Sequence, residues 1–499
     1  MSLREEWCSD KLAKLLDEEL RISTLNEMKH HLQSISSNEV KSTVNSLDLP
    51  LVFDCLNDTN TQQIDLACEV LSLCLENLNI GESATRYGMS LERSLAHPYP
   101  AVKLMILKEL ERNVKNDDIL IDLCKRTSLL ESIIKCVGCE DLGVASKSSN
   151  ILVILGCSDI GIKQLTSIDL IKVFNDVQNL NEINRLRVFE IFVNISKESK
   201  VSFQNLNAAG LISPIVSDLN NNDILLRMNI IEILSQLGLS EHGFEYLESK
   251  NIFVQLSQML KSDDLLEVQL SEPGILKFFG NIGHWKPREI VEKYSFVLFR
   301  MFKNIEVSDF SIFGVSIDAL GYIAVKPDGK YALDSLGIVE KGILTLSNKL
   351  GSLPTELTIR ALKCIENLLI ANETNHHISL ICRKWFFALG TNPMTEIVLK
   401  YSKNPFSELR LAGLNIIKSI SNQVWGQEII KDTPGLIEFL LDRNVETHKD
   451  CKVVKYEIIK ILSSSTLFEQ EVLKRLNLYV REGPFYVQGI MEITFEGND

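Results

Sequence analysis

Residues 210–237 read GLISPIVSDLNNNDILLRMNIIEILSQL. Apolar residues recur at every third or fourth position on both sides of the polar turn NNND at 220–223, a spacing that gathers them on one face of a helix. The stretch therefore predicts two helices joined by a short turn, the second more apolar than the first. One helix pair cannot bury its apolar face alone, so neighbouring pairs must share a continuous core.

The same pattern returns along most of the chain. Apolar segments of helical spacing begin about 40 residues apart, which is the period of HEAT and armadillo repeats. These segments start near Asp48, Met89, Leu129, Asp169, Gly210, Asn251, Tyr294, Gly337, Met394 and Thr433. Strand-like alternation of apolar and polar residues never persists between turns. The sequence predicts an all-α fold, a curved HEAT/armadillo-like α-solenoid of about ten helical repeats.

We expect three regions along the chain. Residues 1–47 predict an N-terminal helical cap, because a terminal repeat must shield the core with a polar surface. Residues 48–468 form the armadillo/HEAT-like repeat array, in which SLPTE and NETNHHIS lengthen one repeat as loop insertions. Residues 469–499 form a C-terminal segment, and helical periodicity stops at Gly483, before an acidic tail.

Composition and charge exclude several classes of protein. The 499 residues are 45% hydrophobic and 24% charged, which is typical of a globular chain. A net charge of −14 argues against nucleic-acid binding, since affinity for phosphates depends on clustered Lys and Arg. No apolar run reaches the ~20 residues that span a bilayer, and the N-terminus lacks the apolar core of a signal peptide. We expect a soluble protein of the cytoplasm, with the nucleus as a second compartment, and eleven reduced cysteines.

Residues 272–285, EPGILKFFGNIGHW, carry three glycines and a lysine, which raises the possibility of a phosphate-binding loop. A P-loop requires the spacing G-x-x-x-x-G-K-[ST] after a buried strand, so that backbone N–H groups converge on phosphates. Neither the spacing nor the strand is present. Within the repeat pattern this stretch falls on a second helix, and we interpret its glycines as positions where neighbouring helices pack closely.

Other motifs with chemical potential are equally poor fits to catalysis. The C-x-x-C motif at 136–139 has neither a redox-enzyme context nor two further zinc ligands, and it is interpreted as structural thiols. The histidine pair at 376–377 is expected in a solvated loop, and Ser316 as a small packing residue rather than a nucleophile. The sequence predicts no catalytic residue, no cofactor and no metal site, and indicates that the protein is not an enzyme.

One recurring asparagine motif does indicate binding. A motif of the form apolar-x-Asn-apolar recurs late in the second helix of several repeats. A carboxamide carries donors and an acceptor, so a column of asparagines could hold the backbone of a partner segment, as in the asparagine ladder of armadillo proteins. The alternative is that each asparagine caps its helix or ties it to the next repeat. Trp285 and Trp425 lie just beyond ladder positions and fit either an interface or internal packing.

Together with Lys277, these residues form the predicted partner-binding set on the concave face. Its members are Asn77, Asn194, Lys277, Asn281, Trp285, Asn367, Asn422 and Trp425.

Several stretches also carry a family resemblance along nearly the whole chain. They are HPYPAVKLMIL (97–107), PGILKFFGNIG (273–283), NPFSELRLAGL (404–414), NQVWGQEIIKDTPGLIEFLLDRNVE (422–446), KYEIIKIL (455–462) and YVREGPFYV (479–487). With these stretches the chain resembles the family of the 26S proteasome non-ATPase regulatory subunit 5. The C-terminal third is the most specific part, because a generic solenoid has no reason to share DRNVE or REGPFYV.

The resemblance implies a non-catalytic chaperone for assembly of the base of the proteasome regulatory particle. Members of this family bind the C-terminal domain of a base ATPase subunit of the regulatory subunit 7 type. They are also found with the subunit 4 type and a large non-ATPase scaffold subunit, and they are absent from the mature 26S particle. The residues themselves leave an alternative open, which is an armadillo-type adaptor or receptor that binds linear peptide segments.

Overall fold

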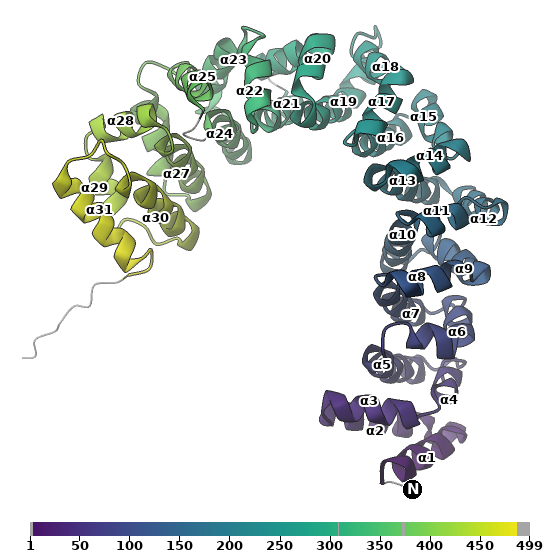
Figure 1. Ribbon diagram of the computed structural model, residues 1–499. Helices are drawn as coiled ribbons and strands as arrows, with labels where there is room; N and C mark the ends of the chain where they lie inside the picture. The colour runs from purple at the N-terminus through teal and green to yellow at the C-terminus, as the bar shows by residue number, and fades with distance from the viewer. Residues whose placement is uncertain (1–2, 308, 372–374, 487–499) are drawn as a thin grey trace, which may run out of the picture. The chain divides into compact units, whose positions relative to one another are not determined.

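The computed structural model describes residues 3–307, 309–371 and 375–486 (Figure 1). These residues form the helices α1 to α31, three short 3-10 or π-helical turns, and no strand. The predicted all-α solenoid class is therefore confirmed. Most of the predicted C-terminal tail, residues 487–499, lies outside the described residues.

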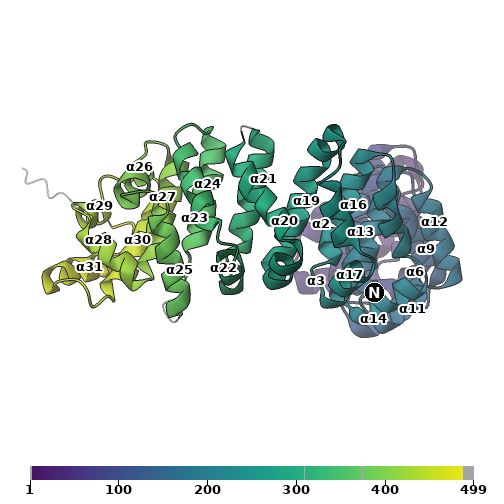
Figure 2. The same cartoon turned by 90° about the horizontal axis from the view of Figure 1, so that it is seen from above.

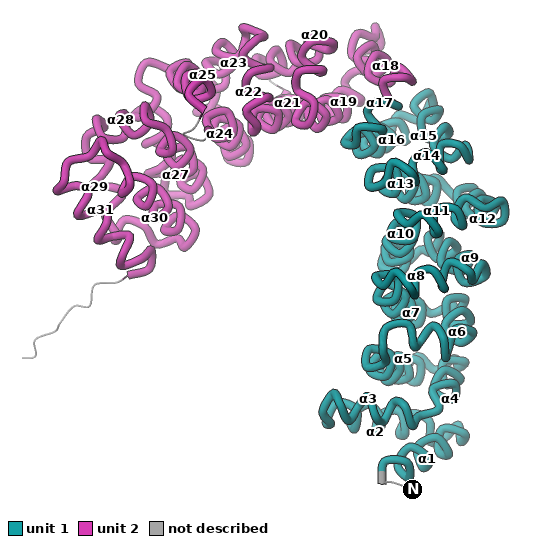
Figure 3. The backbone as a smooth tube through the Cα atoms, in the orientation of Figure 1, with its two compact units in different colours: residues 1–246 teal, residues 247–499 magenta. Residues whose placement is uncertain are grey.

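Two compact units make up the chain, residues 1–246 and residues 247–499 (Figure 3). We call them unit 1 and unit 2 and describe each by itself. The division falls inside α17 (Glu241–Ser249). It coincides with neither of the predicted boundaries, after residue 47 and after residue 468, and these stay predictions.

Unit 1 is a succession of helices joined by short turns. Its helices are α1 (Leu3–Leu15), α2 (Arg21–Ser34), α3 (Ser37–Ser46), α4 (Leu49–Asp54), α5 (Thr61–Asn77), α6 (Glu82–Leu95), α7 (Pro100–Asn113), α8 (Asp117–Cys124), α9 (Thr127–Val137), α10 (Leu142–Gly156), α11 (Asp159–Leu165), α12 (Ile168–Gln178), α13 (Glu182–Glu198), α14 (Lys200–Ala208), α15 (Ser213–Ser217) and α16 (Ile224–Leu237).

Unit 2 continues in the same manner. Its helices are α18 (Ile252–Met259), α19 (Leu265–Trp285), α20 (Pro287–Glu306), α21 (Phe310–Ile323), α22 (Pro327–Asp334), α23 (Val339–Lys349), α24 (Thr355–Leu369), α25 (His376–Phe387), α26 (Lys400–Ser402), α27 (Ser407–Ser421), α28 (Val424–Asp432), α29 (Leu436–Leu441), α30 (Lys449–Ser463) and α31 (Gln470–Glu482). A π-helical turn, Met394–Leu399, precedes α26.

The predicted repeat of two helices is wrong in one respect, because most repeats contain three. In unit 1, α10 is followed by the seven-residue α11 and then by α12. The long helices pack on one another from repeat to repeat, and the short helices α8, α11 and α14 form a second row. Residues 210–219, predicted as one helix, hold only the five-residue α15 and a 3-10 turn.

Asp or Asn begins the long helix of successive repeats. In unit 1 the side chains of Asp141, Asn181 and Asp223 accept hydrogen bonds from first-turn N–H groups of α10, α13 and α16. In unit 2, Asp264 and Asp309 do the same for α19 and α21. The first four N–H groups of a helix lack intrahelical partners, so these side chains fix where each long helix starts.

The long helices of unit 2 form what we call its stacked row, α19, α21, α24, α27 and α30, in which each helix packs on the next. Figure 2 shows α21 and α24 standing side by side. The stretch 272–285 lies inside α19, which confirms that it is a helix and not a phosphate-binding loop.

Glycines let the helices of this row approach closely, as predicted, with one exception. A Cβ added at Gly280 would lie 2.7 Å from the Ala319 Cβ of α21, and one at Gly321 would lie 3.0 Å from the Cα of Cys364 on α24. The interpretation is wrong for Gly274, where an added Cβ meets nothing within 4 Å.

A buried polar network anchors the start of the close-packed segment of α19. Glu272 is 1% exposed, and its carboxylate accepts hydrogen bonds from Arg300 at 2.7 and 2.8 Å and from Asn304 Nδ2 at 2.7 Å, both on α20. Asn304 also donates to Ser316 Oγ of α21 at 3.3 Å, so Ser316 is a buried packing residue, as predicted. A buried carboxylate requires such partners, and they fix three helices in register.

A buried lysine joins the ends of two helices of the stacked row. Lys330 of α22 is 0% exposed. Its Nζ donates to the carbonyl oxygen of Ala324, just after α21. It also donates to the carbonyl oxygen of Asn367 on α24, at 2.6 Å. Carbonyl groups at a helix C-terminus carry partial negative charge, which favours a cation beside them. Burial lowers the pKa of Lys330 to about 8.

The histidine pair at 376–377 differs from the prediction. Both residues belong to the first turn of α25 rather than to a loop, and Asn375 Oδ1 caps that turn by accepting from Ile378 N at 3.2 Å.

Within the described ranges, no single helix has the length and apolar content to cross a membrane. The pair α21 and α22 meets this test only together, and it is bent by 116°.

Alanine substitutions at two glycines of α19 test the close packing. We expect Gly280→Ala to lower the free energy of unfolding by about 1–3 kcal/mol, because its Cβ collides with Ala319. Gly274→Ala, the matched control in open space, should raise it by up to about 1 kcal/mol, since alanine favours a helix more than glycine does. Urea unfolding followed by circular dichroism measures both; shifts of the same sign would contradict the packing account.

A pH series tests the role of Lys330. Lys330→Met should lower the free energy of unfolding by about 1–3 kcal/mol, because two buried carbonyl oxygens lose their donor. The pKa of Lys330 falls from 10.5 to about 8 on folding, so above pH 8 the folded state releases this proton first. The unfolded chain then holds more protons, and the stability contributed by Lys330 rises with pH up to about 10.

The stability difference between wild type and Lys330→Met should therefore widen from pH 8 to about 10 in urea titrations. The same pair of proteins measured near pH 7 supplies the baseline. A difference that stays constant or narrows over this window would show that the buried amine does not titrate as described.

Candidate functional site

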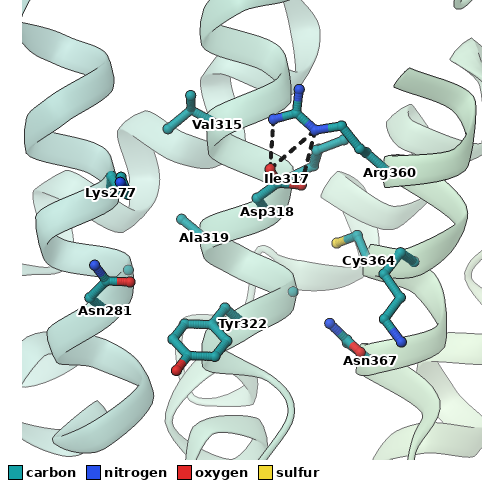
Figure 4. Close-up of a pocket in the computed structure, with 13 residues that line it drawn as sticks. Lys277, Asn281, Val315, Ile317, Asp318, Ala319, Tyr322, Arg360, Cys364 and Asn367 are labelled. Atoms are coloured by element: carbon teal, nitrogen blue, oxygen red, sulfur yellow. Dashed lines mark hydrogen bonds and ion pairs between the residues drawn. The ribbon is translucent and has the colours of Figure 1, made fainter. Parts of the chain in front are cut away.

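A hollow of about 370 Å³ opens on the stacked row of unit 2, between α19, α21 and α24 (Figure 4). This volume falls within the range of about 300–1,000 Å³ that is common for binding sites. Its lining residues are Lys277, Gly280, Asn281, Val315, Ile317, Asp318, Ala319, Gly321, Tyr322, Arg360, Lys363, Cys364 and Asn367.

Small residues make the floor of the hollow. At Gly280, Ala319, Gly321 and Cys364 the three helices approach closely, and no large side chain fills the space above these residues. Burial raises the pKa of the Cys364 thiol to about 12, which keeps it protonated. The floor is therefore apolar and chemically inert.

The lower rim carries two amides on either side of an aromatic ring. Asn281 of α19 and Asn367 of α24 flank Tyr322 of α21 (Figure 4). Tyr322 is 44% exposed, and its ring stacks on that of His284, with ring centres 3.8 Å apart and planes 8° from parallel. His284 Nδ1 donates to the Tyr322 carbonyl oxygen at 2.7 Å, and burial lowers the pKa of this histidine. A neutral imidazole thus holds the tyrosine in place.

The upper rim is charged. Arg360 of α24 and Asp318 of α21 form an ion pair across the helices, with Nη2 2.6 Å from Oδ2 (Figure 4). Lys363 pairs with Glu366 at 2.8 Å on its own helix, and Lys277 is an exposed residue of α19. Three cations and one carboxylate line the hollow, and two of the cations are held in ion pairs.

Three predicted partner-binding residues meet at this hollow, namely Lys277, Asn281 and Asn367. The sequence predicted the two asparagines to occupy equivalent positions in different repeats, and the structure places them on the helices that flank α21. Amides with donors and acceptors above an apolar floor suit a peptide backbone with one inserted side chain. That they bind a partner stays a prediction.

The two tryptophans of the predicted set do not line the hollow. Trp285 is half-buried at the end of α19. Trp425 of α28 is buried, its Nε1 donates to Gln423 Oε1 at 2.9 Å, and its ring lies 5.4 Å from that of Phe386. The contacts of Trp425 fit the alternative of internal packing.

The remaining asparagines of the set do not line the hollow. Asn77 and Asn422 donate Nδ2 to the carbonyl oxygens of Leu73 and Lys418, four residues earlier, at 2.8 and 3.2 Å. These contacts within one helix fit the structural alternative. Asn194 is an exposed residue of α13 in unit 1.

Sequence reasoning missed Tyr322 and the pair of Asp318 and Arg360. Asp318 and Arg360 are 42 residues apart, which is close to one repeat, and this separation was the available signal. Opposite charges one repeat apart at equivalent helical positions can face each other across adjacent helices. Tyr322 gave no comparable signal.

No site for a metal ion emerges among the residues that the structure describes, since no group of three or more His, Cys, Asp or Glu side chains is placed to hold one. The C-x-x-C motif lies at the end of α9. The hollow offers hydrogen bonds, charge and an apolar floor, which are the features of a binding surface.

Several known proteins match this chain over nearly all of its length. The 26S proteasome non-ATPase regulatory subunit 5 of Homo sapiens is 30% identical over 490 residues, covering 96% of this chain and 97% of the relative. The Bos taurus protein of the same name is also 30% identical, and that of Drosophila melanogaster is 26% identical over 510 residues, covering 99% of each chain. A solved structure of an engineered protein covers 93% of this chain and 100% of its own, at 16% identity and a TM-score of 0.40, too low to support an argument.

A family model described as the proteasome non-ATPase 26S subunit matches residues 4–499. The match leaves out only the first three residues, and the relatives cover 96–99% of this chain. The chain therefore belongs to the proteasome non-ATPase 26S subunit family.

Proposed function

We propose that this chain is a chaperone for assembly of the base of the proteasome regulatory particle. It binds the C-terminal domain of a base ATPase of the regulatory subunit 7 type, in complexes that also hold the subunit 4 type and the large non-ATPase scaffold subunit. It then leaves before the 26S particle is complete. The observation that carries the proposal is the full-length match to relatives named as a proteasome regulatory subunit.

A non-catalytic role in the cytoplasm and nucleus completes the proposal. Repeated helices expose a long face without needing a cofactor to fold or to bind. The hollow of unit 2 supplies amides, a held tyrosine and paired charges, which suit the polar surface of a folded domain. Polar, hydrated interfaces dissociate more readily than obligate apolar ones, so such a partner can be released later.

The mixed charges of the hollow refine the expected partner. A chain with a net charge of −14 suits a basic partner in general. At the hollow, two lining cations are already paired, Arg360 with Asp318 and Lys363 with Glu366, so amides and paired charges favour a polar segment there. We therefore expect the ATPase to place a polar loop or helix end at the hollow, and basic residues elsewhere along the interface.

Affinity purification of the tagged full chain from a native extract tests the function. We expect the chain to elute with free base ATPases and without the 20S core. Recovery only on complete 26S particles would contradict a chaperone that leaves during assembly. A sharp linear motif from peptide display, bound without any ATPase, would instead support an adaptor for linear peptides.

Substitutions in the same purification locate the binding surface. Asn281→Ala combined with Asn367→Ala should weaken retention of the ATPase by about tenfold or more, since each lost hydrogen bond is worth roughly 1 kcal/mol. The matched control is Asn477→Ala in α31, because this exposed asparagine of unit 2 donates only to Leu473 O in the contacts described, at 2.8 Å. Stability of the double variant should stay within about 1 kcal/mol of wild type. A large loss of stability with unchanged retention would assign both asparagines a structural role.

A further inference from the structure

A pair of cysteines at the end of α9 in unit 1 has contacts that the proposed function does not use. Cys136 is 2% exposed, whereas Cys139 is half-buried in the loop between α9 and α10. Lys103 of α7 directs its Nζ at the Cys139 Sγ, 3.4 Å away. An ammonium group at this distance stabilises a thiolate, which is the nucleophilic form of cysteine.

The backbone holds the two sulfurs within reach of each other. Cys139 N donates to Cys136 O at 3.2 Å, which closes a tight turn of four residues. The two ends of such a turn lie less than about 7 Å apart at their Cα atoms, and a disulfide requires about 4.4–6.8 Å. The turn is therefore compatible with a disulfide without a large backbone movement.

A second cation fixes this turn from the neighbouring repeat. Arg187 of α13 donates Nη1 to the carbonyl oxygens of Val137 and Cys139 at 3.0 and 2.8 Å. The loop thus stays in place whichever chemical state its sulfur adopts. The acidic residues nearby in the sequence, Glu140 and Asp141, follow the motif, and Asp141 is engaged as the N-cap of α10.

Cys139 differs from every other cysteine of the chain in the direction of its pKa shift. A hydrogen bond from Cys136 and the charges of Lys103 and Arg187 lower the pKa of Cys139 to about 6. The pKa of Cys136 is raised, by its hydrogen bond to Cys139 and by burial. Burial raises the pKa of the other nine cysteines, which are Cys8, Cys55, Cys68, Cys74, Cys124, Cys157, Cys364, Cys382 and Cys451.

We propose that Cys139 is a modification site for hydroperoxides and that Cys136 is its resolving thiol, so that oxidation closes a Cys136–Cys139 disulfide at the end of α9. This inference is independent of the proposed function. It revises the interpretation of the C-x-x-C motif as structural thiols.

The reaction proceeds in two steps. The Cys139 thiolate attacks one oxygen of the hydroperoxide, the O–O bond breaks, and the alkoxide or hydroxide that leaves takes up a proton from solvent. The Cys136 thiol then loses its proton and attacks the sulfenic sulfur of Cys139, displacing hydroxide, which leaves as water. Two thiols and one hydroperoxide give one disulfide, one alcohol or water, and one further water. The peroxide is reduced and the sulfurs are oxidised.

Alkylation of the native full chain with iodoacetamide tests the reactivity of Cys139. Cys157 is the internal control, because these two are the half-buried cysteines among the eleven, and burial raises the pKa of Cys157. At pH 6 about half of Cys139 is thiolate, against roughly 0.1% of a thiol with a pKa of 9. The less basic thiolate of Cys139 is also roughly 20-fold less nucleophilic, which reduces the advantage that comes from its larger thiolate fraction. Cys139 should therefore react roughly 20-fold faster than Cys157.

Peptide mass spectrometry reads both rates in one experiment. Lys103→Gln should slow alkylation of Cys139 at pH 6 severalfold and leave Cys157 unchanged, because the ammonium group that stabilises the thiolate is gone. Equal rates at Cys139 and Cys157 in the wild-type chain would overturn the proposal, and so would an unchanged rate in Lys103→Gln.

Hydrogen peroxide near stoichiometric amounts tests the disulfide. Cys136 and Cys139 fall in one tryptic peptide, residues 136–147, which should lose two hydrogen atoms in mass and recover them on reduction. Cys136→Ser should instead accumulate a sulfenic acid at residue 139 that dimedone traps, and Cys139→Ser should give neither product. Cys157→Ser should behave as wild type. A peptide 136–147 that stays reduced while other cysteines oxidise would overturn the proposal.

Discussion

Close contact between helices of the stacked row is the constraint on which unit 2 depends. A Cβ added at Gly280 would collide with Ala319, and one added at Gly321 would be tight against Cys364. These contacts bring α19, α21 and α24 together over small side chains. The same small side chains leave the hollow above them open, so helix packing and the candidate binding surface have one physical origin.

Polar groups fix the register of the packed helices, which apolar contacts alone would not determine. Apolar burial is largely non-directional, whereas the Glu272 carboxylate is satisfied only when Arg300 and Asn304 of α20 face it. Glu446 repeats this arrangement near the end of unit 2, where it accepts two hydrogen bonds from Arg410 of α27 at 2.6 and 2.9 Å. Breaking a buried pair of this kind by removing one partner costs about 3–5 kcal/mol, so each acts as a strong positional restraint.

Much of this fold could be predicted from periodicity. The long helices, the polar turns that begin them and the helical state of residues 272–285 all follow from apolar spacing and from Asp or Asn at the N-caps. The third helix that most repeats contain could not be predicted. Helices such as α11, with seven residues, are shorter than the window over which a helical period can be recognised.

The candidate site was predictable only in part, for a related reason. Asn281 and Asn367 could be identified from the sequence because they recur at one position of the repeat. Tyr322 and Arg360 did not, because their roles come from partners on other helices, His284 and Asp318. The role of a glycine also depends on what lies opposite, which is why Gly274 and Gly280 look alike in sequence and differ in the structure.

The central claim is that the stacked row of unit 2 contacts the proteasomal partner at the hollow. Crosslinking mass spectrometry of the native complex with a lysine-specific reagent tests it most directly. Lys277 and Lys363 line the hollow, whereas Lys341 of α23 and Lys384 of α25 lie on helices outside the stacked row. We predict crosslinks from Lys277 or Lys363 to a base ATPase and none from the other two lysines. Crosslinks to the ATPase from Lys341 and Lys384 alone would contradict the account.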